Sequence, residues 1–178
     1  MNRFSITARS RRTSRSRLSR LVVLLLALAG LASLAAPAQA AGPTFVTLEF
    51  DNAPVSHYNL GYQQALQPHN APATFFVSSG AVGSSPAQMT WAQLGALAAA
   101  GNDIGGRSVN ATNLTTDPNP QAQVCNDRAA IIAHGLTPAG FAYPGGANNA
   151  TVQNVVKSCG YGTARGIVSG PAAQAVIR

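Results

Sequence analysis

Beyond residue 40 the sequence contains very little charge. Seven of the 12 basic residues are arginines within the first 20 positions, so five basic residues and all five acids follow residue 40. The formal charge of this part is therefore zero, and the pI of about 10.5 belongs to the N-terminal arginines. A neutral chain offers no basic surface for phosphate groups, so we expect no nucleic-acid partner. Its polar surface must come from Ser, Thr, Asn and Gln, which suits contact with neutral sugar polymers.

Long apolar runs are also missing after residue 40, where no stretch is long enough to span a membrane. The one apolar run, 21–36, follows the arginine-rich start and precedes Ala38-Gln39-Ala40, a small-residue cleavage site. That order predicts a secretory signal peptide over 1–40, with an uncleaved anchor as the alternative. We expect a secreted, extracellular protein without a stable membrane span. Its mature part, 41–178, is long enough for one domain with its own core.

Only two cysteines are present, Cys125 and Cys159. In an exported chain an even number of cysteines favours a disulfide, with two buried free thiols as the alternative. Cys125 falls in an expected helix, and Cys159 lies at the end of the next one. The bridge would close a loop of about 34 residues and stabilise the fold by about 3–4 kcal/mol in the chain-entropy view.

Short apolar segments alternate with helical ones through the rest of the chain. Strands are expected at 44–50, 73–77, 103–105, 141–143 and 162–167, and helices at 58–67, 91–100, 120–134 and 150–158. This alternation predicts βα units around a parallel sheet, hence an α/β fold. Thr90 and Gln93 have the spacing of a capping box, and Asn149 is placed to cap the last helix.

The most informative segment is Thr44-Phe-Val-Thr-Leu-Glu-Phe-Asp-Asn-Ala-Pro54. It predicts a buried strand that ends on an acid–amide pair, Asp51 and Asn52. The carboxyl ends of parallel strands form the mouth of α/β folds, where catalytic side chains gather. Asp51 is therefore a candidate catalytic base, and a salt bridge from Asp51 to Arg107 is the structural alternative.

This segment resembles the T-F-D-D-G-P motif of the polysaccharide deacetylases, the NodB-like group of carbohydrate esterase family four. Further segments match that family in order: Ala73-Thr-Phe-Phe-Val77, Gly101-Asn-Asp-Ile-Gly105, Phe141-Ala-Tyr-Pro-Gly-Gly146 and Gly160-Tyr161. The resemblance covers about 44–167. It implies a distorted (β/α) barrel, here incomplete at its C-terminal end, that hydrolyses N-acetyl or O-acetyl groups of chitin-like polymers, peptidoglycan or xylan.

The resemblance also implies a divalent metal, usually zinc, held by one acid and two histidines. Such a metal polarises the acetyl carbonyl and activates a bound water. Asp51 matches the family's general base, but Asn52, Arg107 and Ala111 stand at the three ligand positions. Zinc prefers thiolate, imidazole or carboxylate, and Arg107 brings a permanent cation. We therefore expect no metal cofactor and impaired catalysis.

Three further residues at the expected mouth have weaker claims. Tyr143 ends the fourth expected strand and Pro144 follows it. Both are candidate substrate-binding residues, with Tyr143 stacking on a sugar ring. His57 lies in the first βα connection, where a solvated loop histidine is favoured over a substitute ligand or acid.

Three hypotheses for function remain. The protein could be a hydrolase with substitute ligands such as His57 and Asp103. It could instead be a non-catalytic domain that keeps a groove and binds polysaccharide or peptidoglycan-type glycan. It could also be a decayed fragment without activity. We rank the glycan-binding domain first.

Overall fold

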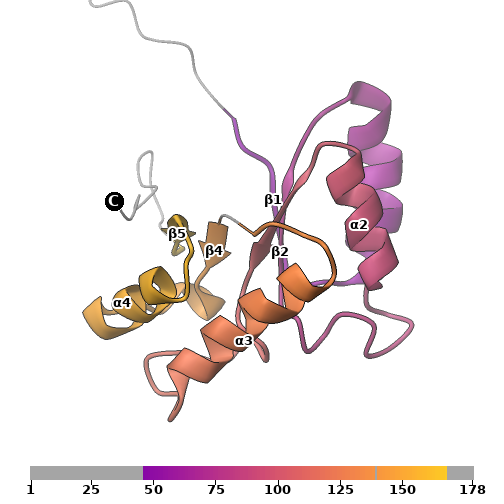
Figure 1. Cartoon of the computed structure of the whole chain (residues 1–178). Helices are drawn as coiled ribbons and strands as arrows, with labels where there is room; N and C mark the ends of the chain where they lie inside the picture. Colours follow the sequence, from indigo (N-terminus) through magenta and orange to yellow (C-terminus); the bar gives the residue numbers. More distant parts are fainter. Residues whose placement is uncertain (1–45, 139, 168–178) are drawn as a thin grey trace, which may run out of the picture. The chain divides into compact units, whose positions relative to one another are not determined.

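The computed structural model describes residues 46–138 and 140–167 (Figure 1). The expected signal peptide, 1–40, and the first two residues of the expected first strand lie outside the described residues. None of the helices in the described part has the length and hydropathy that crossing a membrane requires.

Five parallel strands form a curled half-barrel in the order β1-β2-β3-β4-β5. The strands are β1 (Glu49–Asp51), β2 (Thr74–Val77), β3 (Asp103–Gly106), β4 (Gly140–Ala142) and β5 (Thr163–Arg165). The helical segments are η1 (His57–Leu66), η2 (Gln67–His69), α2 (Trp91–Ala99), α3 (Pro120–Ala133), η3 (Pro144–Gly146) and α4 (Ala150–Ser158). Strands and helices alternate along the chain (Figure 1), which confirms the predicted βα units, and the five strands within 46–138 and 140–167 make up part of a (β/α) barrel.

Capping side chains set the start of each α-helix in the described part of the chain. Thr90 and Gln93 form the predicted capping box at α2. The Asn119 side chain accepts a hydrogen bond at the start of α3, where Pro120 occupies the first turn. Asn149 caps α4 as predicted. Each cap satisfies a backbone N–H group that has no partner inside its helix. The first connection, η1, is wound as a π-helix instead of the expected α-helix.

The prediction of a buried first strand over 44–50 was wrong in both the length and the burial of the strand. β1 begins at Glu49, and the preceding Val46 and Leu48 are 81% and 40% exposed. Among the described strands β1 has one neighbour, β2, because it lies at an edge of the sheet. An apolar run predicts burial whether the strand is central or at an edge, so the sequence pattern could not show this difference.

Helices pack against one face of the sheet in two apolar clusters. The first joins β2 to α2 and α3 through Phe75, Val77, Leu94, Leu97 and Ile131. The second joins β4 and β5 to α3 and α4 through Val124, Phe141, Val152, Val156 and Ala164. Successive side chains of a strand point to opposite faces, so the neighbours of Phe50 and Phe75, Asp51 and Phe76, face the inside of the curl.

The Cys125–Cys159 disulfide is present, with a Cα–Cα distance of 5.0 Å. It joins α3 to the residue that follows α4, and it confirms the prediction from the cysteine count. Figure 1 shows these two helices side by side below β4 and β5.

Candidate functional site

An arginine fills the mouth of the sheet beside the candidate base. Asp51 ends β1 and Arg107 directly follows β3, so both lie at the carboxyl edge. Arg107 Nη1 lies 3.0 Å from Asp51 Oδ2, and Arg107 Nε donates a hydrogen bond of 3.1 Å to Asn52 Oδ1. Arg107 is only 8% exposed. The guanidinium group therefore occupies the space between Asp51 and Asn52, and the salt bridge is the observed alternative for Asp51.

A second arginine, Arg165 at the end of β5, also reaches Asp51. Its Nη2 atom pairs with Asp51 Oδ1, and its Nε atom pairs with Glu49. The Arg165 guanidinium also lies over the Phe76 ring, 4.8 Å from its centroid. β1 and β5 are the two ends of the strand order, so these contacts show that the sheet curls until its edge strands face each other. Together these contacts form a charged cluster with a formal net charge of zero, made up of Glu49, Asp51, Arg107 and Arg165.

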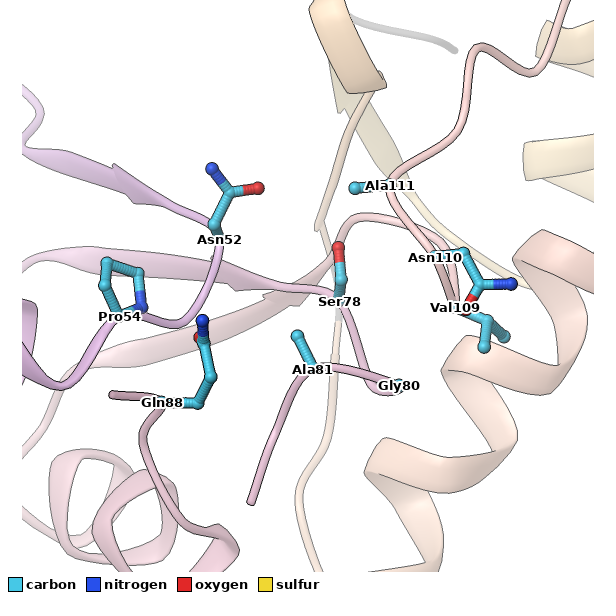
Figure 2. Close-up of a pocket in the computed structure, with 9 residues that line it drawn as sticks. All are labelled: Asn52, Pro54, Ser78, Gly80, Ala81, Gln88, Val109, Asn110 and Ala111. Carbon is cyan, nitrogen blue, oxygen red and sulfur yellow. The ribbon is translucent and has the colours of Figure 1, made fainter. Parts of the chain in front are cut away.

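A cleft of about 470 Å³ opens beside this charged cluster (Figure 2). Its lining residues are Asn52, Pro54, Ser78, Gly80, Ala81, Gln88, Val109, Asn110 and Ala111. Figure 2 shows Asn52 and Gln88 on one side, Asn110 and Ala111 on the other, and Ser78 between them. This volume is in the range of small-molecule sites, and amide and hydroxyl groups supply the polar part of the lining.

Backbone strain is concentrated around the cleft. Asn52, Ser108 and Ala111 have φ angles of 65°, 69° and 53°, in the left-handed region that non-glycine residues rarely adopt. Asn70, at the end of η2, is the fourth non-glycine residue of this kind in the described part of the chain. Residues in this strained conformation persist only where the surrounding packing holds them, and they are common at functional sites.

Replacing Ala111 with glycine should raise the free energy of unfolding by about 1 kcal/mol, because glycine adopts a positive φ without a Cβ penalty. The matched control is Ala129→Gly on the exposed side of α3, which should lower it by about 1 kcal/mol. Urea unfolding measures both. Equal losses in the two variants would contradict the left-handed conformation at position 111.

His57 is not the solvated loop histidine that the sequence favoured. It begins η1, is half-buried, and its ring centroid lies 5.0 Å from that of Phe50. Burial lowers the pKa of His57 below its usual 6.5, and the nearby Asp51 carboxylate partly opposes this shift. The histidine is thus neutral in the folded protein near pH 7. Because the unfolded chain takes up this proton more readily, His57 lowers the free energy of unfolding as the pH drops below about 6.5.

The structure separates the proposed substitute ligands. Asp103 begins β3 at the amino edge of the sheet, whereas Asp51 and His57 lie at or just beyond the carboxyl end of β1. Within the described residues, no group of three or more His, Cys, Asp or Glu side chains gathers closely enough to hold a metal ion. A shared site for His57 and Asp103 is therefore wrong.

The two candidate substrate-binding residues lie inside the protein. Tyr143 is 3% exposed and packs edge-on against Phe141, with ring centroids 5.5 Å apart. Burial raises the pKa of its hydroxyl group. Pro144 is also buried, at the start of η3. The Tyr143 ring has no open face for a sugar, which argues against stacking, and a role of either residue in binding remains a prediction.

Asp127, in α3, is a fully buried carboxylate, with 0% exposure, that was not among the candidate residues predicted from the sequence. Its Oδ1 atom accepts a hydrogen bond of 2.8 Å from the Ser79 backbone, and Oδ2 accepts one of 3.1 Å from the Arg107 backbone. A signal was available, because Asp127 lies three residues after Val124 and four before Ile131, on the apolar stripe of the helix. A charged residue in such a stripe must find polar partners inside the protein.

Residues 38–164 match the polysaccharide deacetylase family. The chain belongs to the polysaccharide deacetylase family. No match was found among curated proteins. The half-barrel is similar to deacetylase PplD of Streptococcus pyogenes, solved with acetate, at 23% identity and a TM-score of 0.63. That match covers 70% of this chain and 55% of the other.

Two other deacetylase-family structures share the fold. The family 4 carbohydrate esterase from Streptomyces lividans is 25% identical, with a TM-score of 0.58, and the match covers 70% of this chain and 62% of the esterase. The BpsB deacetylase domain from Bordetella bronchiseptica is 18% identical, with a TM-score of 0.67, over 99% of this chain and 84% of that one. The chain spans between 55% and 62% of the first three structures that it matches.

Proposed function

We propose that this protein is an exported polysaccharide deacetylase-family domain that binds acetylated glycans in its cleft and does not catalyse metal-dependent deacetylation. The observation that carries the proposal is the position of the Arg107 guanidinium group. It lies 3.0 Å from Asp51 and donates a hydrogen bond to Asn52, so a fixed positive charge fills the position where the family resemblance implies a metal.

The residues at the implied ligand positions do not fit zinc. Asn52 offers a neutral amide, Ala111 offers a methyl group, and Arg107 is a permanent cation with no lone pair to donate. A divalent ion close to Arg107 would also be repelled by it at short range. Both oxygens of Asp51, the base position, already face arginine side chains. This donor set supports binding without metal-assisted hydrolysis.

Three features of the cleft support a neutral glycan as its ligand. The charged cluster beside it is balanced, so it offers no net attraction to an anionic or cationic polymer. Its lining mixes amide and hydroxyl groups with small apolar side chains, which suits sugar hydroxyls and acetamido groups. In addition, the buried Oε1 atom of Gln88, on the cleft wall, has no hydrogen-bond partner within the described structure. An orphaned buried acceptor is costly, and a bound hydroxyl or amide could satisfy it.

Retention on insoluble glycans tests this proposal. We expect purified protein to be retained on at least one of chitin, peptidoglycan and acetylated xylan, without release of acetate. Ala81→Phe should place a ring in the cleft where a sugar would lie and reduce retention about tenfold or more, which corresponds to a loss of about 1.4 kcal/mol in binding free energy. Ala129→Phe, on the exposed side of α3, is the matched control and should bind normally. Absence of retention on all three polymers would support a decayed fragment, and released acetate would support an active hydrolase.

Export rests on the sequence pattern of residues 1–40. We expect N-terminal sequencing of protein from the medium of an expressing bacterial culture to begin at Ala41, directly after Ala38-Gln39-Ala40. Intact chain, with Met1 still present, found only in the cell fraction would contradict export and cleavage.

A further inference from the structure

We propose that Asp127 is a positioning residue that holds both walls of the cleft. The inference rests on the proposed function only in treating the cleft as the binding site. The Asp127 carboxylate lies behind the cleft and outside its lining, so it would act through the backbone of the two loops that form the walls.

The hydrogen bonds of Asp127 reach each wall separately. Oδ1 accepts from the N–H of Ser79, which lies between the cleft residues Ser78 and Gly80 in the loop after β2. Oδ2 accepts from the N–H of Arg107, at the start of the loop that supplies the opposite wall. One rigid helix residue thus fixes the distance between the ends of two loops. It also anchors the backbone of Arg107, whose side chain fills the implied metal position.

The close approach of Asp127 to the strand is built into the sequence at Gly106. A Cβ atom at Gly106 would lie 2.6 Å from Asp127 Oδ2 and 1.9 Å from the Tyr161 hydroxyl oxygen. Any other residue at this position would push both groups away. The Tyr161 hydroxyl also donates a long hydrogen bond of 3.4 Å to Asp127 Oδ2. Gly106 in β3, Asp127 in α3 and Tyr161 just before β5 are therefore closely packed against one another.

The disulfide lies next to this group. Asp127 is two residues after Cys125, and Tyr161 is two residues after Cys159. The bridge therefore ties α3 to the segment that carries Tyr161.

Burial at this position is expensive, which makes the bonds necessary. Desolvation raises the pKa of Asp127, and the hydrogen bonds from Ser79 and Arg107 oppose the shift. If the carboxylate were absent, the two backbone N–H groups would lose their acceptors in a largely buried place. The loops would then have to move to find water or other partners, and the walls would move with them.

Amide hydrogen exchange, followed by NMR, tests the inference without any glycan. In Asp127→Asn the single amide oxygen can serve only one of the two walls. We expect exchange at Ser79, Arg107 or both to become about tenfold faster. Core amides such as Phe75 should change much less, which separates a local loss of positioning from a general loss of stability. The matched control, Asp103→Asn at the far edge of the sheet, should leave both loop amides unchanged.

A folded Asp127→Asn protein with unchanged exchange at both loop amides would overturn the inference, as would an equal change throughout the core. If the variant does not fold, amide exchange in the wild-type protein tests the inference instead. Strong protection of Ser79 and Arg107 supports the inference, and exchange at the rate of an unstructured peptide overturns it. Glycan retention by Asp127→Asn is a separate readout, so failure of the wild-type protein to bind glycan would count against the proposed function and leave the exchange result standing.

Discussion

The triple variant Asn52→Asp, Arg107→His and Ala111→His should bind zinc tightly with one-to-one stoichiometry. The three substitutions supply one carboxylate and two imidazoles, which zinc prefers, and they remove the guanidinium group that occupies the position. The gain in affinity should be on the order of 1000-fold or more, because outer-shell changes alone alter metal affinity by about 10–100-fold. The backbone should accept them, since aspartate and histidine tolerate the left-handed conformation found at positions 52 and 111.

The double variant Asn52→Asp and Ala111→His, which keeps Arg107, is the matched control. It gains two ligands but retains the competing cation, so we expect little or no zinc binding by calorimetry. Equal affinity in the double and triple variants would show that Arg107 does not block the site. A folded triple variant without zinc binding would show that the half-barrel does not bring the three positions together.

Removing the disulfide by replacing Cys125 and Cys159 with serine should lower the free energy of unfolding by about 3–4 kcal/mol. The bridge restrains the unfolded chain over a sequence separation of 34 residues. This loss is a large share of the stability of a domain of this size. Urea unfolding with tryptophan fluorescence from Trp91 would measure it.

Reduction of the wild-type protein provides the matching control for the serine variant. Dithiothreitol should lower the stability of the wild-type protein to that of the variant and should not affect the variant itself. A loss below about 1 kcal/mol would mean that the bridge contributes little beyond the packing of α3 on α4.

Local signals along the chain predicted most of the fold. The capping residues Thr90 and Asn149, the alternation of apolar strands with helices, and the even number of cysteines all act over short distances. For that reason they can be recognised in a linear sequence. The order of the matching family motifs also placed Asp51, Asn52 and Arg107 at one mouth, where the structure brings them into contact.

The missed features depend on how the sheet curls. Arg165 lies 114 positions from Asp51 in sequence, and it meets Asp51 only because the edge strands β1 and β5 face each other. No spacing rule relates two such residues. The exposed start of the expected first strand has the same origin, since an edge and a central strand can have the same apolar pattern. Asp127 differs, because its place on the apolar stripe of α3 was visible in the sequence.

The balance of charges at the mouth follows from the curl as well. Asp51, Glu49, Arg107 and Arg165 form one cluster in which each acid has an arginine partner. Removal of one partner from such a cluster usually costs more than the pair contributes, because a charge is left partly buried and unpaired. Arg107 therefore has a structural role in this chain, and that role is in conflict with a metal at the same place.

A zinc titration of the wild-type protein by calorimetry at neutral pH, on material shown to be folded, tests the central claim most directly. The arrangement of Asp51, Asn52 and Arg107 predicts no binding heat above that of dilution. Tight one-to-one binding of zinc would contradict the account, because it would require the Arg107 side chain to leave its partners and other ligands to take its place.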